Sequence, residues 1–151
     1  MFQKVLVGYD GSSSSAQALA VAVEVVGRFR AALTVAVVRP GEADAASAGV
    51  DHLYPVGEGA RALGIIVDEL REKALAAGAT AVDSVVLHGE TVAQLVDYLE
   101  RNRYDLAIVG SRGLTPGRRL LMGSTSSSLV DRAPCPVLVV RPSRRLAARG
   151  R

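Results

Sequence analysis

Short runs of apolar residues alternate along this chain with longer segments in which apolar positions recur at helical spacing. Five runs have the nearly unbroken apolar character of strands buried inside a parallel sheet, at residues 4–10, 32–38, 80–87, 106–109 and 137–140. Helical spacing predicts helices over about 14–28, 62–78, 91–99 and 124–131. Ser12 and Ser13 are candidate caps of the first helix, Gly78 is placed to stop the second, and Thr91 can cap the third. Alternating strands and helices predict right-handed βαβ units, with helices on both faces of one parallel sheet.

Five strands joined in this way commonly form a doubly wound, Rossmann-like α/β fold with strand order 3-2-1-4-5. The first and fourth strands are then neighbours, and ligands bind outside their carboxyl ends, where the winding direction switches. Asp10 ends the first predicted strand, and Gly110 follows the fourth. We therefore expect Asp10 and the loop that begins at Gly110 to form one site.

The loop after the fourth strand has the residue types that phosphate binding needs. Gly110 and Gly113 leave the strand, nine residues intervene, and Gly123 and Ser124 then open a helix, with Ser124 as the expected N-cap. Glycines let backbone N–H groups approach an anion, and a helix start adds unpaired donors and the positive end of its dipole. The pattern predicts a phosphate or nucleotide site, and a plain glycine-rich connection is the alternative.

Length and composition predict one domain. A chain of 151 residues, 49% of them hydrophobic, can bury one core but is too short for two ordinary domains. No apolar run approaches the ~20 residues that cross a bilayer, and the first residues lack the pattern of a secretory signal. With Cys135 as the lone cysteine, these features predict a cytoplasmic protein with no membrane partner.

The net charge of +3 comes from the end of the chain. Residues 141–151 contain five arginines and no acid, and the remaining residues carry 13 basic and 15 acidic side chains. We expect a domain over residues 1–141 and a basic tail over 142–151. Such a tail could contact nucleic acid, an acidic partner or a membrane surface. Because no aromatic or apolar pattern accompanies the arginines, we favour a solvated tail and predict no specific nucleic-acid partner.

Catalytic and metal-binding patterns are missing from the sequence. The glycine loop has neither the G-x-x-x-x-G-K-[ST] spacing nor its lysine, and no acid follows in a magnesium-binding arrangement. His52 and His88 lack the spacing of a metal motif, and Cys135 lies between two prolines beside a buried strand. We predict no catalytic residue and no metal ligand. Three loop arginines could neutralise phosphates or remain solvated: Arg112, Arg118 and Arg119.

At these residues the chain resembles the universal stress protein family. The segment Gly110-x-x-Gly113, nine residues and then Gly123-Ser124 is similar to the ATP-binding pattern of that family. Residues 7–12 are similar to its first strand and turn, and residues 133–140 to its closing strand. The resemblance extends from Lys4 to Arg141, with the three segments in the order that the family has.

The resemblance implies that the ligand is ATP, with or without Mg²⁺. Gly110 and Gly113 would line the ribose and the phosphates. Gly123, Ser124 and Thr125 would hold the phosphates at the start of the helix.

The other end of the ligand would meet the first two strands. Asp10 would lie near the adenine and the ribose, although it could instead cap the helix that follows. Val38 would contact the adenine through its backbone. Gly8, the remaining residue that we assign to this site, stands where many ATP-binding members of the family have proline.

The resemblance also implies a homodimer formed through the last strand, Val137 to Val140. The residues agree with this, because that strand would otherwise leave an apolar edge open to solvent. We expect a regulatory protein in which nucleotide binding orders the glycine loop and a second loop over 42–59, and so changes a surface for an unknown protein partner. Two alternatives stay open, a nucleotide-free dimeric interaction module and a slow ATPase.

Overall fold

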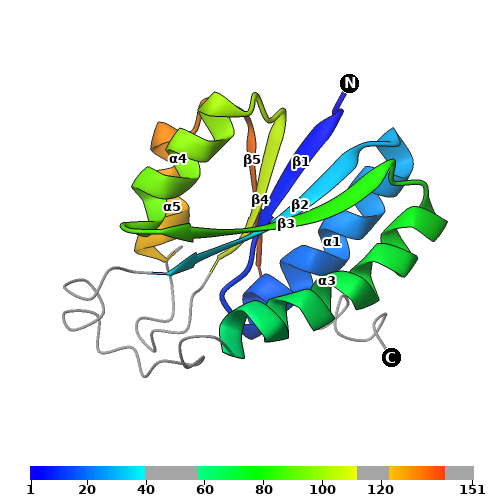
Figure 1. Cartoon of the computed structure of the whole chain (residues 1–151). Helices are drawn as coiled ribbons and strands as arrows, with labels where there is room; N and C mark the ends of the chain where they lie inside the picture. Colours follow the sequence, from blue (N-terminus) through cyan, green and yellow to red (C-terminus); the bar gives the residue numbers. More distant parts are fainter. Residues whose placement is uncertain (40–57, 112–122, 142–151) are drawn as a thin grey trace.

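A computed structural model describes residues 1–39, 58–111 and 123–141 of the chain (Figure 1). Five parallel strands form one sheet in the order β3-β2-β1-β4-β5, which confirms the predicted order. The strands are β1 (Lys4–Gly8), β2 (Ala32–Arg39), β3 (Ala81–His88), β4 (Leu106–Gly110) and β5 (Val137–Val140). The helices of the described residues are α1 (Ser13–Phe29), α3 (Glu58–Ala77), α4 (Thr91–Arg101) and α5 (Ser124–Arg132).

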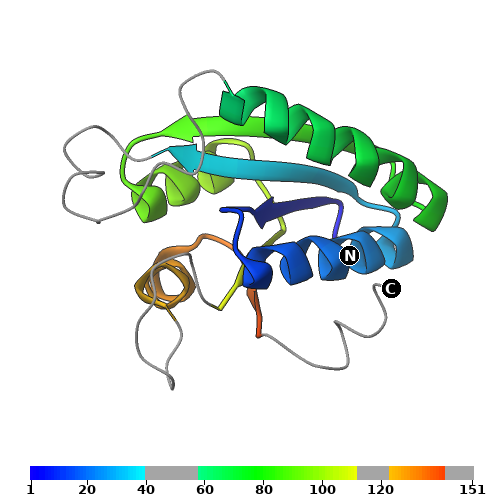
Figure 2. The same cartoon turned by 90° about the horizontal axis from the view of Figure 1, so that it is seen from below.

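Two pairs of helices sandwich the sheet. Helices α1 and α3 cover one face, and α4 and α5 cover the other, as both views show (Figures 1 and 2). On the first face, small side chains at Ala18 and Ala22 let α1 approach Val5 and Val7 closely. On the second face, the buried cluster includes Leu6, Ala107, Leu95, Leu99 and Leu129.

The two central strands, β1 and β4, are buried on both faces. Val5, Leu6 and Val7 have no exposed surface, and neither do Ala107 and Ile108. Burial on both faces explains why these strands are continuous apolar runs rather than alternating ones. The same residues fix the register of the two strands, so their carboxyl ends reach one edge of the sheet together.

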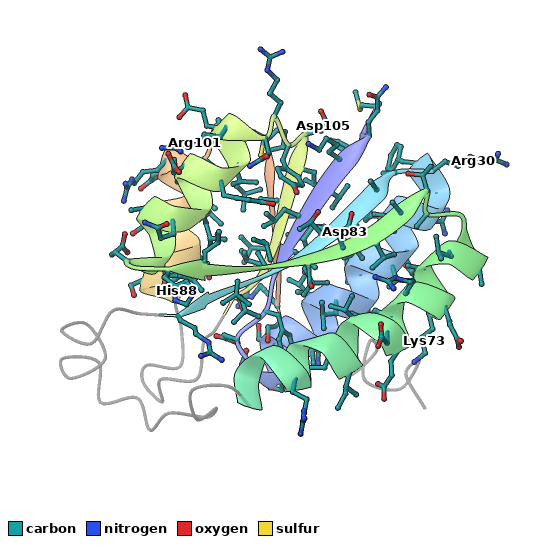
Figure 3. All side chains as sticks on the ribbon, in the orientation of Figure 1. Arg30, Lys73, Asp83, His88, Arg101 and Asp105 are labelled. Carbon is teal, nitrogen blue, oxygen red and sulfur yellow. The ribbon has the colours of Figure 1, made fainter. Side chains whose placement is uncertain are left out.

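At the opposite edge of the sheet, where the strands have their amino ends, a clamp made by the Asp105 carboxylate joins β1 to β4. Oδ2 of Asp105 accepts hydrogen bonds from the backbone N–H groups of Gln3 and Lys4, both at 2.7 Å. The ammonium group of Lys4 donates to the carbonyl of Asn102 at 2.6 Å. Asp105 lies just before β4 and ties the start of β1 to it, at the top of Figure 3. This clamp supports the alignment of β1 and β4 along their whole length.

Helix ends follow the sequence signals in part. Ser12 is the N-cap of α1, where a cap was expected, and its Oγ accepts from the N–H of Ser15. Gly78 follows α3 with a φ of +118°, a conformation that favours glycine, which confirms the predicted stop. The predicted cap of α4 at Thr91 is wrong. Glu90 is the N-cap, because its longer carboxylate reaches the N–H groups of residues 92 and 93 together.

Helix α3 begins at Glu58, a few residues before the helical pattern predicted it. Most of the loop expected over 42–59 lies outside the described residues, and its last two residues belong to α3. None of the described helices combines the length and the apolar character that crossing a membrane would require.

Candidate functional site

The carboxyl ends of β1 and β4 meet the first turn of α1. Strand β1 ends at Gly8, two residues before the predicted end, because the chain turns there into the start of α1. The N–H of Asp10 donates to Ser15 Oγ at 3.3 Å, and the Asp10 carboxylate accepts from the N–H of Ser12 at 2.9 Å. Asp10 therefore supports the turn that leads into α1, while its side chain remains exposed at the edge where we expected it.

Gly110 ends β4 directly beneath α1. A Cβ atom at this position would lie 2.5 Å from Ser14 Oγ and 2.7 Å from the carbonyl carbon of Ser14. Both distances are shorter than a real Cβ contact, so only glycine lets α1 and β4 approach as they do. Figure 2 shows the beginning of α1 and helix α5 on either side of the end of β4. The glycine predicted to line a ligand therefore also has a packing role.

Backbone hydrogen bonds bring the two ends of the glycine loop together. The N–H of Gly123 donates to the carbonyl of Ser111 at 2.7 Å, and the N–H of Ser111 donates to the carbonyl of Val140 at 2.9 Å. Val140 is the last residue of β5 and is in register with Gly110. The loop therefore starts and finishes at one place, the carboxyl ends of β4 and β5.

Helix α5 starts without a cap from any side chain that the structure describes. Ser124 was the expected N-cap, but Gly123 occupies that position and Ser124 is the first helical residue. The reason is that the bond from Gly123 to Ser111 fixes Gly123 in an extended conformation, with a ψ of 156°. No side chain among the described residues caps this start, and Ser124 and Thr125 are both exposed. The first turn of α5 thus presents backbone donors and the positive end of a helix dipole.

Val38 presents its peptide group to the same edge. Strand β2 runs one residue past the predicted end, and the carbonyl of Arg39 accepts from the N–H of Gly89 on the β3 side. In a strand, the N–H and C=O of one residue point to the same side, and those of the next residue point to the opposite side. Since the carbonyl of Arg39 faces β3, the N–H and C=O of Val38 face the β1 side. There β1 has already ended at Gly8, which is in register with Ala36.

Comparison with known proteins identifies the family of this chain. The model of the universal stress protein family matches residues 1–141. The chain belongs to the universal stress protein family. It is 30% identical over 149 residues to universal stress protein YxiE of Bacillus subtilis, a match that spans 93% of this chain and 100% of YxiE.

Solved structures of related proteins share the fold. Universal stress protein UspA from Lactobacillus plantarum superposes with a TM-score of 0.75 at 26% identity, over 93% of this chain and 98% of UspA. A universal stress protein crystallised in complex with cAMP superposes with a TM-score of 0.68 at 31% identity, over 94% of this chain and 99% of that one.

The sequence did not predict a group of buried serines that hydrogen-bond around the site of this universal stress protein. In the described part of the chain, every buried polar residue except Thr34 is a serine at the carboxyl edge of the sheet: Ser12, Ser14, Ser15, Ser111 and Ser126. Their hydroxyl and backbone groups bond to strand ends and helix starts. Serines in the first helical turn after a strand-end glycine were the available signal. The sequence could not show which carbonyl each hydroxyl reaches.

Several predicted residues lie outside the described part of the chain. These are Gly113, Arg112, Arg118, Arg119, His52 and the basic tail 142–151. His88 is exposed at the end of β3 (Figure 3). Cys135 is half-buried, and burial together with the charge of Asp105 raises the pKa of its thiol, which disfavours the reactive thiolate. Among the described residues, no three His, Cys, Asp or Glu side chains form a group that could hold a metal ion.

The two strand-end glycines predict a contrast between substitutions. Gly110→Ala is expected to lower the free energy of unfolding by about 1–3 kcal/mol, because the new methyl group would meet the backbone of α1. Gly8→Ala is expected to have a much smaller effect, because its Cβ would lie 3.2 Å from one side-chain methyl of Val109 and 4.0 Å from a backbone atom, the Ile108 carbonyl oxygen. Urea unfolding of both variants measures the difference. Equal losses would contradict the packing role of Gly110.

Proposed function

We propose that this universal stress protein binds an adenine nucleotide across the carboxyl ends of β1 and β4, with ATP as the expected ligand. The observation that carries the proposal is the start of α5. It is hydrogen-bonded to the carbonyls of Gly110, the last residue of β4, and of Ser111, which follows it, yet no described side chain caps it. A helix start that is held in place and left without a cap is suited to binding phosphate.

The phosphate end of the ligand would lie at Gly123, Ser124 and Thr125. The first N–H groups of α5 have no partner within the helix, and the helix dipole favours an anion beside them. Gly123 carries no side chain that would block the approach. Gly110 and Gly113 would form the opposite wall, as the glycine pattern predicts.

The base and the ribose would lie toward β1 and β2. Val38 turns its peptide group to the space beyond the end of β1, where it can pair with the edge of a base. Asp10 offers an exposed carboxylate beside that space, which can accept a hydrogen bond from a ribose hydroxyl or hold a water molecule of bound Mg²⁺. Gly8, the last residue of β1, would lie beside the base and the ribose.

The relative crystallised with cAMP supports a ligand that contains adenine, at 31% identity over most of both chains. We propose binding with at most slow hydrolysis. Phosphoryl transfer needs an oriented nucleophile and charge stabilisation, and the glycine loop lacks the lysine that supplies such charge in P-loop enzymes. Nucleotide occupancy would then act as a signal to a protein partner, which is a regulatory role.

A charge at the start of α5 tests the phosphate site. Ser124→Asp places a carboxylate on the exposed first residue of the helix, where the dipole stabilises it by about 0.3–1 kcal/mol. The same charge repels a phosphate, and at ~4 Å and an effective dielectric constant of ~20 the repulsion reaches about 4 kcal/mol. We expect ATP affinity measured by calorimetry to fall more than about tenfold while the melting temperature is unchanged or higher.

Ser124→Asn is the matched control, since it has nearly the same size without the charge. It should bind ATP much more tightly than Ser124→Asp does. If Ser124→Asp binds ATP as well as the parent protein, the phosphates do not lie at α5. If the parent binds neither ATP, AMP nor cAMP, the nucleotide-free interaction module becomes the better account.

We further propose a cytoplasmic homodimer formed through β5, with residues 142–151 as a basic extension outside the nucleotide-binding domain. Strand β5 ends the strand order, so one of its backbone edges has no neighbour in the described sheet. Leu138, in the middle of β5, is 38% exposed. An apolar edge strand of this kind is suited to pairing with a second copy of the chain.

Leucine-to-lysine substitutions at two exposed positions test the dimer. Leu138→Lys is expected to weaken self-association by at least about tenfold, because an ammonium group would be buried at the centre of the contact. Leu75 is exposed to a similar degree, 44%, but lies on α3 and away from β5, so Leu75→Lys should leave self-association unchanged. Light scattering after size-exclusion chromatography measures both. A dimer that survives Leu138→Lys would contradict the β5 interface.

A further inference from the structure

Helix α5 is short and has two buried side chains. It has nine residues, fewer than the ~12 that a helix needs for marginal stability in isolation. Its buried side chains are Ser126 and Leu129, which lie three residues apart and so on one face. Leu129 belongs to the second half of the helix, where it enters the apolar cluster with Leu95 and Leu99. In the first turn, Ser126 is the buried side chain that faces the sheet.

The hydroxyl group of Ser126 bonds the first turn of α5 to the sheet. Its Oγ donates to the carbonyl of Gly110, the last residue of β4, at 2.9 Å. Gly110 is in register with Val140, and the Val140 carbonyl accepts from the Ser111 N–H at 2.9 Å and from Ser14 Oγ at 3.3 Å. Ser126 therefore connects α5 to the same pair of strand ends that holds α1 and the beginning of the glycine loop.

We propose that Ser126 is a positioning residue for the nucleotide phosphates, an inference that rests on the proposed function. The N–H groups that would bind phosphate belong to the first turn of α5, and Ser126 fixes that turn relative to β4. Ser126 is only 4% exposed, so it acts through the helix backbone rather than as a ligand contact of its side chain. The base and ribose contacts at Val38 and Asp10 belong to β2 and to the turn before α1, which Ser126 does not touch.

This separation makes positioning distinguishable from a general contribution to stability. Loss of the hydroxyl leaves the Gly110 carbonyl without this donor and frees the first turn of α5 to shift. Contacts to phosphate depend on that turn, whereas the adenosine contacts proposed at Val38 and Asp10 do not. A merely structural bond would change the melting temperature and would affect ATP and adenosine alike.

The test is Ser126→Ala, with the affinities for ATP and adenosine measured by calorimetry or NMR titration. We expect the ATP affinity to fall about tenfold, the loss of one hydrogen bond, with the adenosine affinity unchanged. Ser126→Thr keeps the hydroxyl group and should restore most of the ATP affinity. Ser128→Ala, a half-buried serine of the same helix, is the control and should bind both ligands as the parent does.

If Ser126→Ala does not fold, Ser126→Cys replaces it, because a thiol keeps the volume of the side chain and donates only weakly. Unchanged ATP affinity in the folded variant would overturn the inference while leaving nucleotide binding intact. Equal losses of ATP and adenosine affinity would also overturn it. A parent protein that binds neither ligand would instead reject the proposed function, and the inference with it.

Discussion

The contact between Gly110 and the first turn of α1 is the constraint on which the site depends. Because Gly110 has no Cβ, the backbone of Ser14 can lie against the end of β4. That approach lets Ser14 Oγ reach the Val140 carbonyl, which also accepts from Ser111. The start of α1, the ends of β4 and β5 and the glycine loop are thereby held together. A larger residue at 110 would separate parts that the proposed ligand must touch together.

The edge of the sheet formed by the amino ends of the strands and the edge formed by their carboxyl ends have different roles in this universal stress protein. At one edge, the Asp105 carboxylate clamps the start of β1 to β4. At the other, buried serine hydroxyls bond to strand-end carbonyls, no described side chain caps the start of α5, and the first residue of this helix, Ser124, is exposed. The apolar layers between them fix the register. The fold can thus keep polar groups at the carboxyl ends of the strands oriented for a ligand, because the apolar layers supply the stability of the molecule.

Strands and their order were predictable from the sequence, but the hydrogen bonds at the site were not. In an α/β chain of this length, an apolar run such as 106–109 is stable as a strand buried in the sheet. The alternation with helices then restricts the order of the strands. N-caps depend on local geometry. The sequence predicted Thr91 and Ser124 as N-caps, but Glu90 and Gly123 occupy these positions. The bond from Ser126 to Gly110 joins residues 16 positions apart, and no pattern in the sequence specifies it.

An NMR titration of the ¹⁵N-labelled protein with ATP tests whether the ligand binds at the carboxyl ends of β1 and β4. We expect the amide signals of Asp10, Ser111 and Ser124 to shift as ATP is added, and those of Lys4 and Asp105, at the amino ends of the strands, to stay unchanged. Figure 3 shows how far apart the two edges lie, with Asp105 at one and His88 at the other. Shifts centred on Asp105, or no shifts at saturating ATP, would contradict this expectation.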